Sequence, residues 1–272
     1  MYVGVVCFKV VKDYVYDHFL LFHISMRVFV SSIYNTNRNL VFSEMAIKRF
    51  VLLCEDTYGP TFLSFNIHGI LHLIEDVLRF GPLDSYSAFP YENNMIYFRR
   101  MCRKPHLSLQ QIAARLAEQE QCKKNLVQNN YIKVWKKHEQ GPLPYTNDNS
   151  KMYNQYKFLK SPDMTIGVCV RDDCCILSDS SICCVKNILQ YENNYFIVVK
   201  KFLQVADFYS IGISSFSVDI YKCSELAHDY DIILLENIKA KCFRVSYWTC
   251  LSSNKVMRDK IVKHEFVVAV MQ

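Results

Sequence analysis

The sequence predicts an α+β fold, with a helical N-terminal half followed by a small antiparallel β barrel or sandwich. Apolar residues recur at helical spacing through the first half, and with a two-residue period in short β-branched and aromatic segments of the second half. Hydrophobic residues make up 51% of the 272 residues, which is enough for a sizeable core. We therefore expect a helical segment (1–128), a linker (129–162) and a small β domain (163–272).

The helical half divides into five amphipathic patterns, at residues 12–34, 40–58, 66–80 and 91–103 and from Ser108 onward. Gly59-Pro60 and Gly81-Pro82 should end the second and third helices, because glycine suits a left-handed cap and proline cannot continue a helix. Ser108 and Gln111 have the spacing of a capping box. The first ten residues match no pattern that we can assign, and they are interpreted as unrelated neighbouring sequence.

The second half changes character after the polar segment 129–162, which has no apolar period and is interpreted as a linker or loop. Short apolar segments separated by polar breaks then predict about six strands. The cysteines at 174–175 and 183–184 are adjacent pairs. Neighbouring side chains on a strand point to opposite faces, so these cysteines are expected to be small core residues rather than zinc ligands.

The twelve cysteines are expected to be reduced thiols. A chain of this size and apolar content needs no disulfide staples, and its apolar start lacks the features of a signal peptide. No run of about 18 uncharged apolar residues is present, so no membrane span is expected. These observations predict an intracellular and nuclear setting.

Positive charge is concentrated in one part of the chain. Ten lysines and arginines but only two acids lie between Met95 and Lys137, giving this segment a charge of +8, whereas the rest of the chain sums to −2. Such a segment is typical of a surface that binds a polyanion such as nucleic acid, or of a solvated helix surface. We assign candidate nucleic-acid contacts to six residues: Arg99, Arg100, Arg103, Lys104, Lys123 and Lys124.

His68 and His72 lie four residues apart on one predicted helix, and side chains at this spacing point the same way. The pair could therefore contribute to a metal site. The alternative is that both imidazoles make hydrogen bonds inside the core. A metal site needs further ligands, and the sequence does not identify them.

Glu92 lies in an apolar neighbourhood near the start of a predicted helix, where a carboxylate gains from the helix dipole. It could be a catalytic acid, a structural cap or the partner of a following arginine. The chain contains no glycine-rich phosphate loop, G-x-S-x-G elbow or H-E-x-x-H motif, so the residues alone do not indicate a self-sufficient enzyme of a common class.

Several of these features occur together, in one order, between Tyr58 and Glu118. They are the N-I-H-x-x-x-H-L-x-x-D-V helix, the F-G-P-L-D-x-x-S-A-F turn, the F-P-Y-E-N helix and the following basic R-K-P. This segment resembles part of the transposase-derived proteins of insect and other animal genomes, which are similar to the CACTA (En/Spm-like) DNA transposases. The resemblance is strong over about 60 residues and weaker elsewhere.

The resemblance implies a parent enzyme in which three acidic residues on an RNase H-like fold hold two Mg²⁺ ions. Glu92 matches the position of the third acid, whereas the first two would lie upstream of this sequence. We therefore expect an inactive transposase fragment that binds no cofactor by itself, retains DNA as a partner and does not cut DNA. The alternative is a non-enzymatic nuclear module whose β barrel binds chromatin or a peptide.

Overall fold

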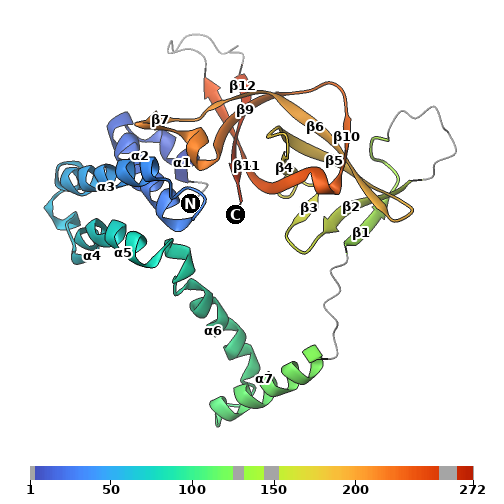
Figure 1. Cartoon of the computed structure of the whole chain (residues 1–272), viewed down its shortest axis with the longest axis horizontal. Coiled ribbons are helices and arrows are strands. Elements are labelled where there is room, and N and C mark those ends of the chain that lie inside the picture. Colours follow the sequence, from blue (N-terminus) through green and yellow to red (C-terminus); the bar gives the residue numbers. More distant parts are fainter. Residues whose placement is uncertain (1–3, 125–131, 144–152, 251–261, 272) are drawn as a thin grey trace.

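The structure, a computed structural model, describes residues 4–124, 132–143, 153–250 and 262–271. The helical half contains seven α-helices (Figure 1). Their bounds are α1, Gly4–Cys7; α2, Asp13–Val30; α3, Asn37–Tyr58; α4, Phe65–Gly69; α5, Leu73–Phe80; α6, Phe89–Met101; and α7, Ser108–Lys124. Short 3₁₀ turns lie at Phe8–Val10, Pro60–Phe62, Ile70–His72 and Leu83–Ser85. None of the helices in the described part of the chain has the length and apolar run needed to cross a membrane.

The predicted helix ends are confirmed at both glycine–proline pairs. Gly59 and Gly81 have φ values of 89°, and their N–H groups donate to the carbonyls of Glu55 and Val77. The pattern at 66–80 is divided into α4, a 3₁₀ turn at Ile70–His72 and α5 rather than forming one regular helix.

The second half forms one ten-stranded antiparallel sheet and a separate two-stranded hairpin, β7–β8. The strands are β1, Lys133–His138; β2, Asn154–Lys160; β3, Thr165–Gly167; β4, Cys174–Leu177; β5, Ile182–Tyr191; β6, Asn194–Asp207; β7, Ser210–Ile211; β8, Ile213–Ser214; β9, Ile220–Leu226; β10, Asp231–Leu234; β11, Ile238–Cys250; and β12, Val262–Val270. The order of the sheet is β1-β2-β5-β4-β11-β12-β9-β6-β10, with β3 beside β2 and a further pairing between β5 and β6.

The predicted linker at 129–162 is wrong. It contains β1 and β2, which pair with each other, and β2 also pairs with β5 and β3. These strands were missed because their lysines hide the apolar alternation, and an edge strand such as β1 tolerates polar residues. The estimate of about six strands applied to residues 163–272, where the described residues form ten, including the two-residue strands β7 and β8.

The two halves share one hydrophobic core. It joins side chains of α2, α3 and α5 to side chains of the β7–β8 hairpin and its flanks, β9 and β12. Its fully buried members include Leu20, Ile24, Val28, Phe29, Val218 and Ile220. The helical segment therefore packs against the β domain, in addition to a smaller buried cluster between α2 and α3.

The N-terminal segment also belongs to this core. Val5 is buried, and its carbonyl accepts a hydrogen bond of 2.8 Å from the Tyr16 hydroxyl. The Lys9 ammonium lies 4.4 Å from the centroid of the Phe208 ring, a cation–π distance. Residues 4–10 thus contact both halves of the protein.

The β7–β8 hairpin carries the β domain onto the helices. Gly212 at its tip has φ of 72°, and a Cβ atom there would lie 2.1 Å from the Phe42 ring of α3. Only glycine fits both this backbone conformation and this close approach. Ile211 on the same hairpin packs against the buried cluster formed by α2 and α3.

A buried hydrogen-bond network crosses the boundary between the halves. The Arg27 guanidinium of α2 donates to the Val218 carbonyl (2.6 Å) and to the Tyr34 hydroxyl (3.0 Å). Tyr34 in turn donates to the Asp219 carboxylate (2.9 Å), which also accepts from Tyr221 (2.6 Å). Burial, followed by the Asp219 hydrogen bond, raises the pKa of Tyr221. The carboxylate thereby balances the buried guanidinium charge through one intervening hydroxyl.

His23 lies one helical turn before Arg27 and is also buried, with 3% of its surface exposed. Its Nε2 atom has no hydrogen-bond partner in the described part of the chain. Burial, with the nearby Arg27 charge, lowers the pKa of His23 to about 3. The folded state therefore holds this imidazole neutral.

Removing the central hydroxyl of the network should destabilise the protein. We expect Tyr34→Phe to lower the free energy of unfolding by about 1–3 kcal/mol, because the charged groups of Arg27 and Asp219 each lose a hydrogen bond. Urea unfolding measures this. The control Tyr14→Phe removes a hydroxyl from a side chain that is 59% exposed, and it should change stability little. Equal effects of the two variants would contradict the proposed importance of the network.

Acid should destabilise the fold through His23. The folded-state pKa lies below the unfolded-state value near 6.5, so the stability is complete above that pH and is lost as the pH falls toward about 3. Between pH 7.5 and 5, the wild type should lose about 2 kcal/mol more than His23→Phe, as measured by urea unfolding at each pH. His68→Phe, at an exposed histidine, should follow the wild type. Parallel pH profiles for all three proteins would refute this account.

Candidate nucleic-acid interface

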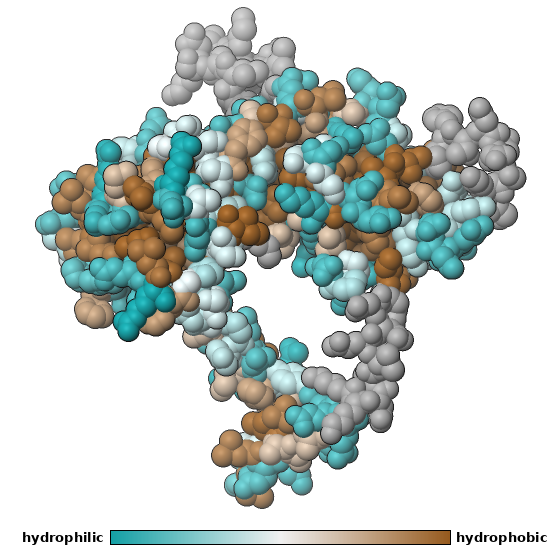
Figure 2. Space-filling model, in the orientation of Figure 1, coloured by the Kyte–Doolittle hydropathy of each residue, from teal (hydrophilic) through white to brown (hydrophobic). Residues whose placement is uncertain are grey.

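Helices α6 and α7, with the turn between them, form an arm that extends away from the rest of the fold (Figure 1). We define the arm as residues 89–124. Met101 is the only buried residue of α6, and Figure 2 shows hydrophobic side chains exposed along the arm. The exposed apolar side chains include Phe89, Tyr91, Met95, Ile96 and Leu109. The arm therefore presents apolar and cationic groups together.

The turn between α6 and α7 is held by one side chain, Gln111. Its Oε1 atom accepts from the N–H groups of Arg103 (2.9 Å) and Lys104 (3.2 Å), and its Nε2 atom donates to the carbonyls of Lys104 (3.0 Å) and His106 (2.7 Å). The predicted pairing of Gln111 with Ser108 is thus replaced by contacts to the preceding turn. A second tether joins the hydroxyl of Tyr97 to Gln119.

The predicted cationic residues of the arm lie close together around this turn. Arg99 and Arg100 occupy the last turn of α6, and Arg103 and Lys104 follow directly. All four side chains are exposed, and none forms an ion pair with a carboxylate in the described ranges. Lys123 and Lys124 end α7, but their side chains fall outside the described residues. The four cations are free to contact phosphate groups.

Glu92 does not lie in an apolar environment as the sequence predicts. It is exposed in the first turn of α6, and its neighbours Tyr91 and Met95 are exposed too. Among the described residues, no three His, Cys, Asp or Glu side chains converge as metal ligands. The residues around Glu92 therefore do not fit the Mg²⁺ site that the transposase resemblance implies.

His68 and His72 do lie side by side, with ring centroids 5.6 Å apart. Both are exposed, on α4 and on the 3₁₀ turn after it, and the nearest carboxylate oxygen, from Glu75, is 3.9 Å from His72 Nδ1. Within the described segments no third protein ligand joins the pair. The interpretation as core histidines is wrong, because neither imidazole is buried.

The paired cysteines face opposite sides of the sheet, as predicted. Cys175 and Cys183 pack in one core cluster with their sulfur atoms 3.4 Å apart, whereas Cys174 and Cys184 pack in another. The Cys174 thiol, together with burial, raises the pKa of Cys184. Protonated buried thiols are poor nucleophiles and poor metal ligands, so these residues serve the core.

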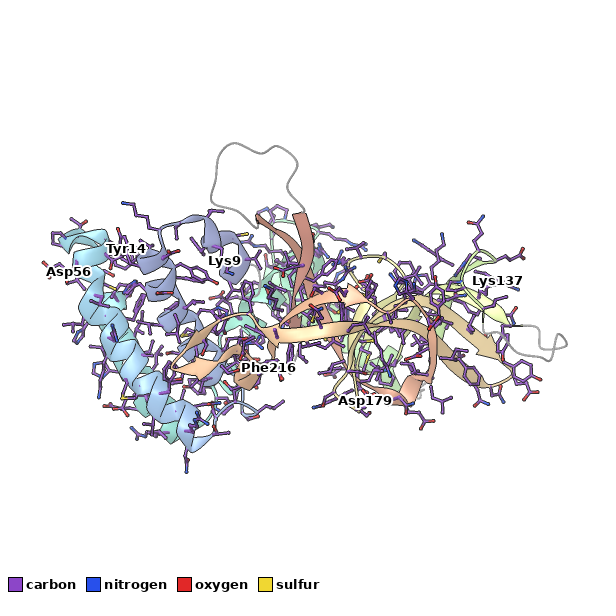
Figure 3. The ribbon with its side chains drawn as sticks, turned by 90° about the horizontal axis from the view of Figure 1, so that it is seen from above. Lys9, Tyr14, Asp56, Lys137, Asp179 and Phe216 are labelled. Atoms are coloured by element: carbon purple, nitrogen blue, oxygen red, sulfur yellow. The ribbon has the colours of Figure 1, made fainter. Side chains whose placement is uncertain are left out.

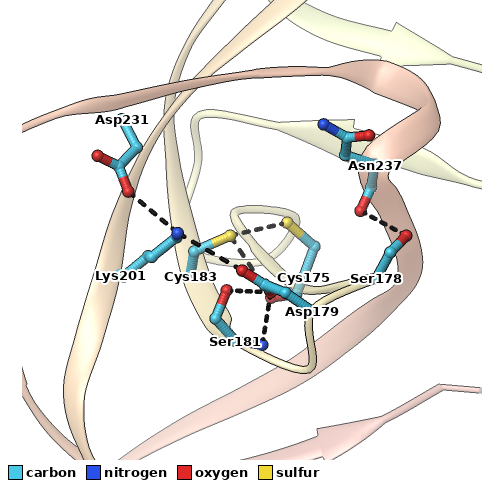
Figure 4. Close-up of polar contacts among 8 residues, drawn as sticks. All are labelled: Cys175, Ser178, Asp179, Ser181, Cys183, Lys201, Asp231 and Asn237. Carbon is cyan, nitrogen blue, oxygen red and sulfur yellow. Dashed lines mark hydrogen bonds and ion pairs between the residues drawn. The ribbon is translucent and has the colours of Figure 1, made fainter.

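The polar residues above Cys175 and Cys183 are also committed to the fold (Figure 4). Lys201 of β6 contacts Asp231 of β10 at 3.2 Å and Asp179 of the β4–β5 turn at 3.6 Å. Ser178 of the same turn donates to the Asn237 carbonyl at 3.2 Å. These contacts join β6, β10, the β4–β5 turn and the 3₁₀ turn Leu235–Asn237.

A surface pocket of about 460 Å³ lies between α2 and α3. Its lining includes Tyr14 and His18 of α2 and Asp56 of α3, and Figure 3 shows Tyr14 and Asp56 on the helical side of the molecule. The His18 ring is buried, with Nε2 bonded to the Phe50 carbonyl at 2.8 Å and Nδ1 to the Tyr58 hydroxyl at 3.0 Å. A carbonyl only accepts, so Nε2 carries the proton and the ring is fixed as a structural link between the helices.

Comparison with protein-family models matches one part of the chain and gives no function. Residues 137–263 match the family model described as Domain of unknown function (DUF8592). The match contains all of β2 to β11, which is slightly less than half of the chain, and excludes the helical half. No curated protein matches the sequence.

The surface that β1 and β2 form was not identified from the sequence. Trp135 and Phe158 stack on each other there, surrounded by lysines, inside the supposed linker. The signal was present: Tyr156, Lys157 and Phe158 alternate apolar and charged residues, and Trp135 stands among lysines.

The hypothesis that His68 and His72 bind a metal ion can be tested by comparing metal uptake by the wild type and a histidine variant. We expect wild type and His72→Ala to take up the same amount of Zn²⁺ at stoichiometric metal, because two exposed imidazoles do not complete a site. Equilibrium dialysis with metal analysis measures the uptake, and the cysteines contribute equally to both proteins. Lower uptake by His72→Ala would show that the pair does hold a metal ion.

Proposed function

We propose that this chain is a nucleic-acid-binding protein related to the CACTA-like transposases, and that the arm contacts DNA phosphates. The observation that carries the proposal is the group of four exposed cations at the α6–α7 turn, Arg99, Arg100, Arg103 and Lys104, without carboxylate partners in the described ranges. Binding of this kind acts in the nucleus and requires no bond cleavage.

The geometry of the turn supports phosphate binding in particular. Gln111 fixes the backbone of Arg103 and Lys104, so these side chains project from a defined position and lose less conformational freedom on binding. Arginine is suited to phosphate because its guanidinium presents two parallel donors. If the turn were only a solvated surface, neutral polar residues would serve equally well there. Such residues would not attract a polyanion over a long range, whereas these cations do.

We also propose that six strands of the sheet form a small closed barrel. β5, β4, β11, β12, β9 and β6 pair in that order, and β6 pairs again with β5. Such a ring leaves no free edge among its members. β1 and β2 lie outside this ring, next to β5. Their outer surface is therefore not part of the interior of the proposed barrel.

The salt dependence of duplex binding tests the role of the arm. We expect the change of Arg99, Arg100, Arg103 and Lys104 to Gln to reduce the slope of log affinity against log salt by up to about 3.5, or about 0.9 for each phosphate that is no longer neutralised. Fluorescence anisotropy with a labelled duplex at several salt concentrations measures the slope.

The matched control removes four cations elsewhere, Lys12 just before α2 and three residues of α3: Lys12, Arg38, Lys48 and Arg49 are changed to Gln. It lowers the net charge equally, but it should leave the slope near that of the wild type. If both four-residue variants reduce the slope equally, the net charge and not the arm governs binding. If wild-type affinity does not change with salt, phosphate contacts are absent and the proposal fails.

A further inference from the structure

We propose that the outer face of β1 and β2 is a binding site for single-stranded nucleic acid, on which an unpaired base stacks beside Trp135 and lysines hold the backbone. We call this surface the β1–β2 face and define it by Lys133, Trp135, Lys136, Phe158 and Lys160. It is separate from the arm, and its existence does not depend on duplex binding by the arm.

Two aromatic rings form the centre of the face. Trp135 and Phe158 are directly opposite in the β1–β2 pairing, with ring centroids 5.3 Å apart and planes 10° from parallel. Both side chains are only partly buried. Parallel rings at a strand surface form a platform that a nucleobase can extend, because every base has a π face.

The position of the Phe158 ring is fixed by two neighbouring residues, Gly167 and Lys136. Its cross-strand partner on β3 is Gly167, where a Cβ atom would lie 2.6 Å from the Phe158 ring. The glycine thus leaves the space that the ring occupies. The Lys136 ammonium lies 5.0 Å from the centroid of the same ring, and Lys136 adopts a left-handed backbone conformation with φ of 57°. The face is therefore ordered before any ligand arrives.

The charged residues of β1 and β2 are all lysines. Lys133 and Lys160 are directly opposite each other, an arrangement of like charges that destabilises a strand pair. Lys137 and Lys157 add two more exposed cations, and neither strand contains an acidic residue. None of these five lysines forms an ion pair elsewhere in the described part of the protein. An anionic ligand would relieve the repulsion between Lys133 and Lys160.

The aromatic rings and the lysines together indicate which class of ligand fits the β1–β2 face. An aromatic cage for a methylated lysine would need acidic or neutral surroundings, because a cation is repelled by five lysines. An acidic peptide satisfies the charge but leaves the rings unused. Single-stranded nucleic acid satisfies both, since its backbone is anionic and its bases are unpaired and free to stack.

The position of the face fits this role. Among the described residues β1 is the edge strand of the sheet, so no described strand lies on its outer side. Figure 3 places Lys137 of β1 at the end of the molecule opposite to Tyr14 and Asp56. The helical pair formed by α2 and α3 therefore does not obstruct the face.

The aromatic part is tested with Trp135→Leu, which keeps an apolar side chain and removes the ring. Binding of labelled 12-nucleotide single strands, one of DNA and one of RNA, is measured by anisotropy at fixed salt. We expect Trp135→Leu to weaken binding about 5- to 150-fold, whereas Trp135→Phe keeps most of it because a ring remains. Thermal unfolding confirms that both variants are folded. Wild-type affinity in a folded Trp135→Leu protein would overturn the proposal.

The electrostatic part is tested with Lys133→Gln/Lys160→Gln. For a single strand this pair should reduce the salt slope by about 1.4, or about 0.7 for each phosphate contact. The control Lys12→Gln/Lys239→Gln removes two exposed lysines elsewhere and should leave the slope unchanged. Equal slopes for the wild type and Lys133→Gln/Lys160→Gln would overturn the assignment of these lysines to the backbone.

Two further outcomes decide between ligand classes. Equal losses of affinity for duplex and single strand in Trp135→Leu, or displacement of the single strand by poly-glutamate at equal charge concentration, would overturn the proposal in favour of a general anion surface. A higher affinity for one of the two single strands shows whether the ligand is DNA or RNA. The arm variant with four glutamines should retain the Trp135 effect, which separates this test from that of the arm.

Discussion

The buried contact between Arg27 and the Val218 carbonyl is the constraint on which the arrangement of this protein depends. It places a guanidinium of α2 against the backbone that leads into β9, across the boundary between the helical and β halves. Burial of that charge is tolerable only because Tyr34 connects it to Asp219, and because apolar side chains from both halves exclude water around it. The halves consequently form one structural unit, and only the arm extends beyond it.

Local features of the fold could be predicted from the sequence because they depend on neighbouring residues. The glycine caps at Gly59 and Gly81, the burial of α2 and the opposite facing of Cys174 and Cys175 all follow from spacing along the chain. The shared core could not be predicted in this way. Arg27 and Val218 are separated by 191 positions, and no local pattern records which distant carbonyl a buried guanidinium will reach.

The expected apolar surroundings of Glu92 are wrong for a related reason. Glu92 has apolar neighbours in sequence, but these neighbours are themselves exposed on the arm, so the expected burial does not exist. The lysines of β1 and β2 obscured the apolar alternation of two strands, and they also line the surface that we propose for single-stranded nucleic acid. The cations at Arg99 to Lys104 were identified correctly as exposed, because clustered charge without acidic partners remains at the surface whatever the fold.

The arm and the β1–β2 face offer complementary chemistry, cations on a fixed turn and cations around stacked rings, on one protein. Hydrogen–deuterium exchange with and without a partly single-stranded DNA tests this account most directly. We predict that binding slows amide exchange in residues 99–111 and in 133–137, with no change in α2 and α3. Slower exchange confined to α2 and α3, or no change anywhere at saturating DNA, would contradict the assignment of these surfaces to nucleic acid.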